Sequence, residues 1–247
     1  MKKVKLDHHI SSKFDSELED IRSRLLAMGG EVKVQLADAL QALVNGDVEL
    51  ARRVIHRDDE INAAEGTIDR LCTTLLARRQ PTAGDLRFVI AVLKSITHLE
   101  RIGDEAEKIA RVSVSLAAAD RPKNNYRDLI HLGDRVSDLI HEAMDSMARF
   151  DTELAVKISR ADQDVDQEYD SILRNAITYM MEDSHNVRRI LDTIWIARAL
   201  ERIGDHAKNI GEYVIYIVHG DDVRHASIDE MQRTIAADQS EEGEDAS

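Results

Sequence analysis

The sequence predicts an all-α protein made of two tandem, pseudo-symmetric, antiparallel three-helix bundles. Apolar residues recur three or four positions apart through nearly the whole chain, which is the spacing of one helix face. Two prolines and 4% aromatic residues in 247 fit helices better than a sheet protein with its many turns. The hexamer LERIGD at Leu99–Asp104 returns at Leu200–Asp205, an offset of 200 − 99 = 101 residues. A repeat at nearly half the length indicates two copies of one structural unit.

Three helices are predicted in the first half of the chain. The first is amphipathic, and Gly46 followed by Asp47 supplies a C-terminal glycine and then an N-cap for the next helix. The second helix continues until Pro81 interrupts it. Thr82 and Asp85 have the spacing of a capping box, which opens the third helix, the carrier of the first hexamer.

The second half repeats this plan. After the turn-like stretch 120–125, a helix is predicted to about Arg149, and Asp151 caps a further helix that reaches about Glu182. The last helix carries the second hexamer and ends near Gly220. Each half is therefore expected to be a helix–helix–helix unit with long helices.

These boundaries divide the chain into a first bundle at 8–120, a second bundle at 121–222 and a tail at 223–247. The tail is rich in acids and has no basic residue among its last ten positions, so it is expected to be disordered. The acids at its end are Asp238, Glu241, Glu242, Glu244 and Asp245.

Charge and cysteine content narrow the function classes. The formal charge is −14, from 47 acidic and 33 basic residues, which argues against nucleic acid as a partner. No apolar run is long enough for a membrane span or a secretory signal. Cys72 is the one cysteine and lies on an apolar helical face, so it is expected in the core. These features predict a cytoplasmic protein.

The repeated hexamer has one apolar face and one acidic edge. On a helical wheel, Leu99, Ile102 and Gly103 fall on the face that packs the bundle, where the glycine lets a neighbouring helix approach closely. Glu100 and Asp104 stack beside this face as an i, i+4 pair. The second copy has the same stripe, formed by Glu201, Asp205 and Asn209.

Stacked carboxylates repel each other, and a hard cation would stabilise them, as would an arginine or lysine from a neighbouring helix. Chance alone gives about nine acidic i, i+4 pairs in a chain this acidic, so recurrence in both copies is what singles these out. The pattern alone favours a solvated or salt-bridged face over a metal site.

The second helix of each bundle offers further oxygen ligands. Asp58 lies on the first of these helices, and Asp162 and Asp166 lie one turn apart on the other. If they face the hexamer helices, each bundle could gather enough oxygen ligands for an open divalent or iron-type metal site. The alternative is again a solvated face.

No sequence pattern points to catalysis. Glu182 and His185 have the spacing of a di-iron ligand pair, but the motif occurs once, whereas a carboxylate-bridged di-iron enzyme needs it on two helices. The chain also lacks a glycine-rich phosphate loop, a zinc signature and a nucleophile elbow. The sequence therefore predicts that the protein is not an enzyme.

Several segments resemble the PhoU family of bacterial phosphate-signalling regulators. The segment RQPTAGDLR at Arg79–Arg87 and the first hexamer are similar to the family's first half. Tyr179–Asp183 and the second hexamer with its HAKNI continuation are similar to the second half. The resemblance covers residues of about 8 to 225 and implies the tandem-bundle fold.

The resemblance also implies a function. It implies a cytoplasmic negative regulator of the phosphate-starvation response that restrains phosphate uptake and couples two membrane proteins. These are the nucleotide-binding subunit of the phosphate ABC transporter and a sensor histidine kinase. The protein is then peripheral at the inner membrane through these partners, and we expect a homodimer. The alternative is a helical protein that binds or stores metal or phosphate.

The resemblance further implies metal binding through E/D-x-x-x-D motifs, which here are Glu100 with Asp104 and Glu201 with Asp205. The first copy departs from the family pattern, because Lys108 stands where the second copy has Asn209. A lysine at this position is expected to replace the metal as counter-charge. The second site is therefore the more favoured of the two.

Overall fold

The protein is described by a computed structural model that covers residues 12–117, 126–182 and 186–245. Within these residues it consists of helices and contains no strand, which confirms the predicted all-α class. The helices are α1 (Ser12–Asn45), α2 (Val48–Arg78), α3 (Ala83–Leu116), α4 (Arg127–Arg149), α5 (Thr152–Glu182), α6 (Val187–His219) and α7 (Ile228–Asp245).

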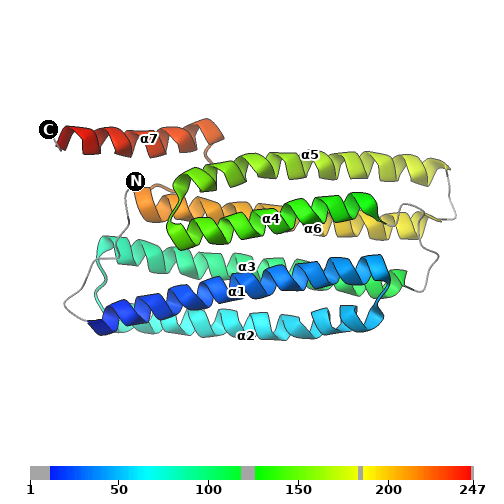
Figure 1. Cartoon of the computed structure of the whole chain (residues 1–247), viewed down its shortest axis with the longest axis horizontal. Coiled ribbons are helices and arrows are strands. Elements are labelled where there is room, and N and C mark those ends of the chain that lie inside the picture. The colour runs from blue at the N-terminus through cyan, green and yellow to red at the C-terminus, as the bar shows by residue number, and fades with distance from the viewer. Residues whose placement is uncertain (1–11, 118–125, 183–185, 246–247) are drawn as a thin grey trace.

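Figure 1 shows α1, α2 and α3 as one group of long, nearly parallel rods and α4, α5 and α6 as a second group beside it. The helices α3 and α6 carry the two hexamers and pack against each other at the centre. One continuous apolar core runs through both groups, from Leu18 in α1 to Ile217 in α6.

The predicted helix starts are present as hydrogen bonds. The Asp47 carboxylate accepts a hydrogen bond from the Leu50 backbone N–H at 2.9 Å, and Gly46 takes the left-handed conformation before it, with φ of 61°. Asp85 Oδ2 accepts from the Thr82 hydroxyl at 2.6 Å and from its backbone N–H at 3.3 Å. Local capping therefore fixes the ends of α1, α2 and α3.

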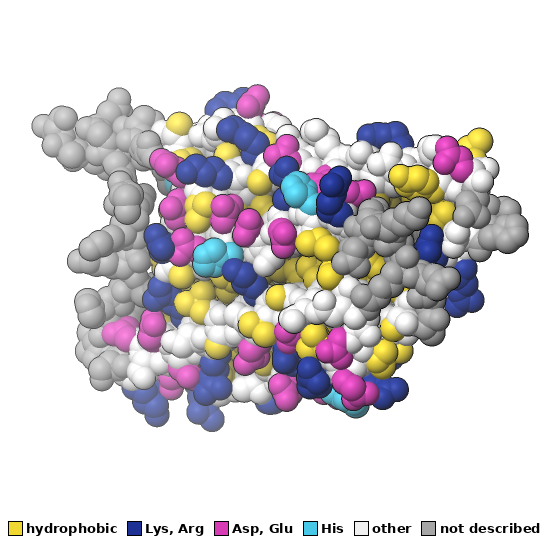
Figure 2. All heavy atoms as spheres, turned by 45° about the vertical axis from the view of Figure 1, so that its right-hand side comes forward, with side chains coloured by type: hydrophobic (Ala, Val, Ile, Leu, Met, Phe, Trp, Pro, Cys, Tyr) yellow, Lys and Arg dark blue, Asp and Glu magenta, His cyan; other side chains and the backbone are white. Residues whose placement is uncertain are grey.

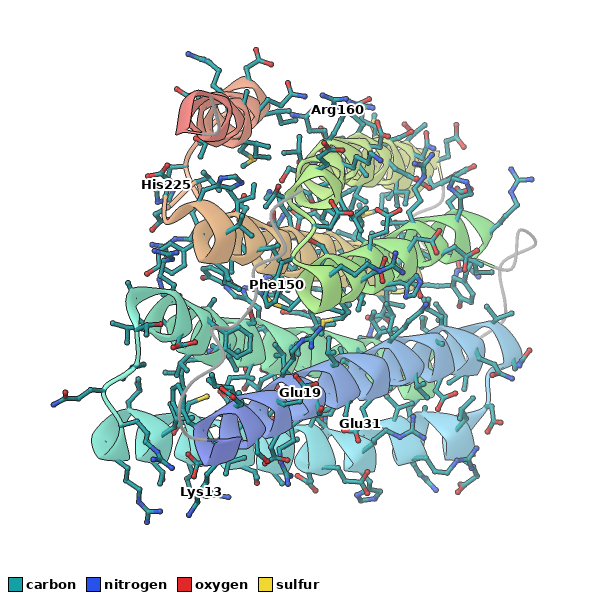
Figure 3. The ribbon with its side chains drawn as sticks, turned by 60° about the vertical axis from the view of Figure 1, so that its left-hand side comes forward. Lys13, Glu19, Glu31, Phe150, Arg160 and His225 are labelled. Carbon is teal, nitrogen blue, oxygen red and sulfur yellow. The ribbon has the colours of Figure 1, made fainter. Side chains whose placement is uncertain are left out.

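Phe150 links the two groups where α4 ends. It takes a left-handed backbone conformation, with φ of 54°, and turns the chain into α5. Its ring packs edge-on against Phe88 of α3, with 6.1 Å between ring centroids, and lies 5.8 Å from the Arg22 guanidinium of α1. Figure 3 shows Phe150 between the upper and lower helices.

The tail differs from the sequence-based expectation. Residues 223–247 were expected to be disordered, but Ile228–Asp245 forms α7, which contacts α5 and α6. Val223, Met231 and Ile235 are buried there. Met231 and Ile235 are one helical turn apart, so they give the segment an apolar stripe that the count of acids concealed. His225 lies in the connection between α6 and α7 (Figure 3).

Candidate functional site

The glycine of each hexamer lies against a buried aspartate of the preceding helix. A Cβ atom added to Gly103 would lie 3.2 Å from Asp58 Oδ1 of α2. A Cβ added to Gly204 would lie 3.2 Å from Asp162 Oδ1 of α5. Each bundle therefore uses its hexamer glycine to bring one carboxylate onto the hexamer helix, as the sequence predicted for the close approach of the helices.

The first cluster is built around Asp58, which side-chain amides hold. Gln35 Nε2 donates to Asp58 Oδ1 at 3.3 Å, and Asn62 Nδ2 donates to Oδ2 at 3.1 Å. Burial raises the pKa of Asp58, the Gln35 hydrogen bond opposes this, and the charges of Asp104 and Glu107 raise it further. Asp58 itself is therefore held by two amides, and among the described residues no cation is paired with it.

Glu100 and Asp104 complete this cluster on its outer side. Their nearest cation is exposed Arg101, whose guanidinium lies 3.4 Å from the Glu100 carboxylate and 3.9 Å from that of Asp104. Burial, followed by the charge of Asp104, raises the pKa of Glu100. An exposed ion pair of this kind contributes little to stability.

The expected role of Lys108 in this cluster is wrong. Its ammonium donates to Glu105 at 3.0 Å, whereas Glu100 and Asp104 are paired with Arg101. Glu105 is three residues before Lys108 and within its reach, and Glu100 is two turns away.

The second cluster contains a lysine at its centre. Lys208 Nζ donates to Asp162 Oδ2 at 2.6 Å and to Asp205 Oδ1 at 3.1 Å. Burial alone would lower the pKa of Lys208, but the hydrogen bond and charge of Asp162, together with Asp205, raise it above its ordinary value. The lysine therefore stays protonated and pairs with two of the acids that were predicted as metal ligands.

The other predicted ligands of this cluster are also engaged. Glu201 is nearly buried, and Arg198 donates to its Oε1 at 2.7 Å. The Asn209 amide donates to the backbone carbonyl of Asp205 at 2.8 Å, inside its own helix. Asp166 is exposed on α5, and burial and then the charge of Asp205 raise its pKa. Its role as a ligand stays a prediction.

One substitution between the repeats separates the two clusters. At the offset of 101, Lys208 corresponds to Glu107, so a cation in the second copy stands where the first copy has an acid. The first helices also differ: Gln35 lies against Gly103, and apolar Leu139 lies against Gly204. The second bundle thus neutralises its aspartate with Lys208, while the first uses the Gln35 amide. Aligning the two repeats would have revealed the Glu107–Lys208 exchange.

Across residues 12–117, 126–182 and 186–245, no three His, Cys, Asp or Glu side chains are placed to hold a metal ion. In the second cluster, Lys208 supplies the positive charge that a metal would otherwise bring. The metal-binding assignments to Asp58, Glu100 and Asp104, and to the matching acids of the second bundle, stay predictions.

A partly buried polar group between the bundles had no signal in the sequence. His98 Nδ1 of α3 lies 3.1 Å from His206 Nδ1 of α6, and His98 Nε2 lies 3.2 Å from the Tyr213 hydroxyl. Burial, then the charges of His206 and Arg224, lower the pKa of His98 to about 4. Both histidines are thus neutral at pH 7, and they join α3 to α6 by hydrogen bonds. Their positions are not equivalent in the repeat, so spacing could not pair them.

Three remaining sequence expectations have plain outcomes. Cys72 is fully buried, as predicted, and burial raises the pKa of its thiol to about 12. His185, the histidine of the single di-iron-like motif, lies outside the described residues. Among the described helices, none has an apolar stretch long enough to cross a bilayer.

Comparison with known proteins gives matches along the whole chain. The model of the PhoU domain family matches twice, at residues 25–113 and 129–214. A phosphate-specific transport system accessory protein PhoU homolog of Pseudomonas aeruginosa is 49% identical over 233 residues, 94% of this chain and 96% of the relative. The phosphate-specific transport system accessory protein PhoU of Escherichia coli K12 is 42% identical over 245 residues, 98% of this chain and 100% of the relative.

Solved structures show the same fold. The crystal structure of PhoU from Pseudomonas aeruginosa aligns with a TM-score of 0.81 at 49% identity, over 84% of this chain and 100% of that one. The phosphate transport system regulatory protein PhoU from Streptococcus pneumoniae aligns with a TM-score of 0.79 at 29% identity, over 85% of this chain and 99% of that one.

Proposed function

Because this chain belongs to the PhoU family, we propose that it is a non-enzymatic negative regulator of the phosphate-starvation response. In this role it couples the state of the phosphate ABC transporter to a membrane sensor histidine kinase and restrains phosphate uptake. Its direct contacts are the transporter's nucleotide-binding subunit and the kinase's cytoplasmic part. It acts at the inner face of the membrane through these partners, as a homodimer.

The observation that carries this proposal is the end-to-end match to transport-system accessory proteins. The relatives from Pseudomonas aeruginosa and Escherichia coli are matched over 96% and 100% of their length, so the similarity is not confined to one shared bundle. Both repeats are present, and both keep the glycine–aspartate contact that sets the spacing of their helices. A regulator of this kind acts through its surface, which the two bundles provide.

The internal polar contacts support a structural use of the repeated acids. Asp162 is neutralised by Lys208 of the same bundle, and Asp58 is held by amides of Gln35 and Asn62. These contacts leave the outer faces of the bundles for partners.

Deleting the gene tests the proposal. The reporter is a phosphate-starvation promoter, read in phosphate-rich medium with and without a plasmid copy of the wild-type gene. We expect high expression in the deletion strain and repression once the copy is restored. A promoter that stays repressed in the deletion strain would overturn the regulatory role. Stoichiometric binding of Mn²⁺ or phosphate by the purified protein would then favour storage.

A further inference from the structure

The exposed large hydrophobic side chains gather at one end of the second bundle. Seven are exposed among the described residues, and five of these lie between positions 177 and 195. They are Ile177, Tyr179, Met181, Leu191 and Trp195. Single exposed apolar residues are normal on a soluble protein, but a concentration of this kind indicates an interaction surface. In Figure 2, hydrophobic side chains are exposed on the face turned toward the viewer, with basic and acidic side chains beside them.

Trp195 of this group also lines a groove between α3 and α6. The groove has a volume of about 340 Å³. Ile109 and Val112 of α3 and Ile196 and Ala199 of α6 give it an apolar lining. Trp195 is 64% exposed, and Leu191 lies one turn before it on the same helix. The groove therefore has an apolar floor to which both bundles contribute.

The groove is positively charged although the chain is strongly acidic. Three cations line it, Lys108, Arg198 and Arg202, against one carboxylate, Glu105. Glu105 Oε1 is shared by Lys108 and Arg202, each with its nitrogen 3.0 Å away. Arg198 is already paired with Glu201, at 2.7 Å, so the excess comes from Lys108 and Arg202, which share one carboxylate. The groove therefore keeps one uncompensated positive charge in a protein whose formal charge is −14. Electrostatic complementarity therefore selects an acidic occupant.

We propose that this groove binds an acidic amphipathic helix of a partner protein. The apolar lining takes aliphatic or aromatic anchors, and the carboxylates of the helix pair with Lys108 and Arg202 at the rim. A small free anion fits less well, because Lys108 and Arg202 already share Glu105 and the lining offers little else to it. This inference rests on the proposed regulatory function and names the chemistry of its partner.

The location of the groove gives binding a consequence. Its walls belong to different bundles, and Arg202 of α6 reaches Glu105 of α3 across the boundary. An occupant therefore contacts α3 and α6 together and favours one arrangement of the bundles.

Trp195 reports occupancy directly, because it is the one tryptophan of the chain. The full-length protein is titrated with a synthetic amphipathic peptide that has a leucine face and a glutamate face. We expect a saturable blue shift of the emission and weaker quenching by acrylamide. The same peptide with lysine in place of glutamate is expected to bind at least about tenfold more weakly.

Matched variants locate the effect. Arg202→Gln removes one groove cation and is expected to weaken binding of the glutamate peptide by about tenfold. Arg52→Gln removes an exposed arginine of α2 that pairs with Glu49 and does not line the groove, and it is expected to change nothing. Unchanged Trp195 emission, or equal affinity for the two peptides, would overturn the inference.

A test in cells separates this inference from the proposed function. Trp195→Ser is placed at the native locus, with Val34→Ser, an exposed site of α1, as control. We expect the first to derepress the phosphate-starvation promoter with unchanged helicity and Tm, and the second to repress fully. If the gene deletion derepresses the promoter but the Trp195→Ser strain represses it fully, the proposed binding role of the groove is overturned. The regulatory role of the protein then stays intact. If the deletion itself has no effect, the proposed function fails and the peptide titration alone decides the groove.

Discussion

Lys208 Nζ lies 2.6 Å from Asp162 Oδ2, and Asp162 is buried almost completely between α5 and α6. The pair joins the two helices that meet at Gly204, at the point where the sequence offers stacked acids to a cation. An internal ammonium thus lies where the sequence pattern left open either a metal or a basic side chain.

Lys208→Met is expected to destabilise the protein by about 3 kcal/mol, because it leaves the Asp162 carboxylate buried without its partner. Lys108→Met is the control, since Lys108 is half exposed and Glu105 keeps Arg202; its cost is expected to be below about 1 kcal/mol. Urea unfolding followed by circular dichroism measures both. An equal loss of unfolding free energy in the two variants would show that the buried Lys208–Asp162 pair stabilises the protein no more than the exposed Lys108–Glu105 pair.

Lys208→Glu is expected to create cation binding in the second cluster. The change removes the internal positive charge and adds a carboxylate beside Asp162 and Asp205, which suits a hard divalent cation. Mn²⁺ is expected to raise the Tm of the variant, and a further Asp162→Asn change is expected to abolish this rise. If the wild-type protein already gains stability from Mn²⁺ in a way that depends on Asp162, the lysine does not exclude the metal.

Gly103→Ala and Gly204→Ala are each expected to cost about 1–3 kcal/mol, because the new methyl group would press on a buried aspartate and its neighbours. Gly30→Ala, in α1, meets no atom within 4 Å and is expected to stabilise by about 0.5–1 kcal/mol. The same chemical change, glycine to alanine, is therefore expected to lower the free energy of unfolding at Gly103 and Gly204 and to raise it at Gly30. Thermal unfolding of the three variants checks them, and a neutral Gly204→Ala would contradict the close approach of α5.

Glu212 is expected to make the protein less stable as the pH rises. Burial raises the pKa of this carboxyl from 4.5 to about 7. Between these values the folded state holds a proton that the unfolded state has lost, so the free energy of unfolding falls with increasing pH, by up to about 3 kcal/mol. Glu212→Gln is expected to flatten this dependence and to raise the Tm at pH 8. An unchanged pH profile in the variant would rule out Glu212 as the source.

His98 is expected to make the protein less stable as the pH falls, the opposite of the effect of Glu212. Its pKa falls from 6.5 to about 4, so between these values the unfolded state binds a proton and the folded state does not. Stability is therefore complete above pH 6.5 and falls as the pH drops toward 4, by up to about 3 kcal/mol. NMR titration is expected to show a neutral His98 ring at pH 5.5. His98→Gln should reduce the acid sensitivity, whereas His131→Gln, at an exposed site on α4, should not.

Much of the fold followed from local sequence. The capping groups Asp47, Thr82 and Asp85 act within one helical turn, so their hydrogen bonds could be predicted from spacing alone. Helical periodicity and the hexamer repeat likewise predicted two similar bundles and the packing role of Gly103 and Gly204. The acidic composition of the tail predicted disorder, because it hid the short apolar stripe on which α7 packs.

The chemistry of the candidate site depended on tertiary structure. Lys208 meets Asp162 across two helices, 46 residues away in the chain, and His98 meets His206 between the two bundles. Such contacts depend on how far one helix slides and turns against another, which local periodicity does not determine. The sequence by itself determined the helices, their ends and their duplication, because these rest on interactions between near neighbours. Only the tertiary structure decided which charges meet, and so showed that a lysine neutralises the second acidic cluster.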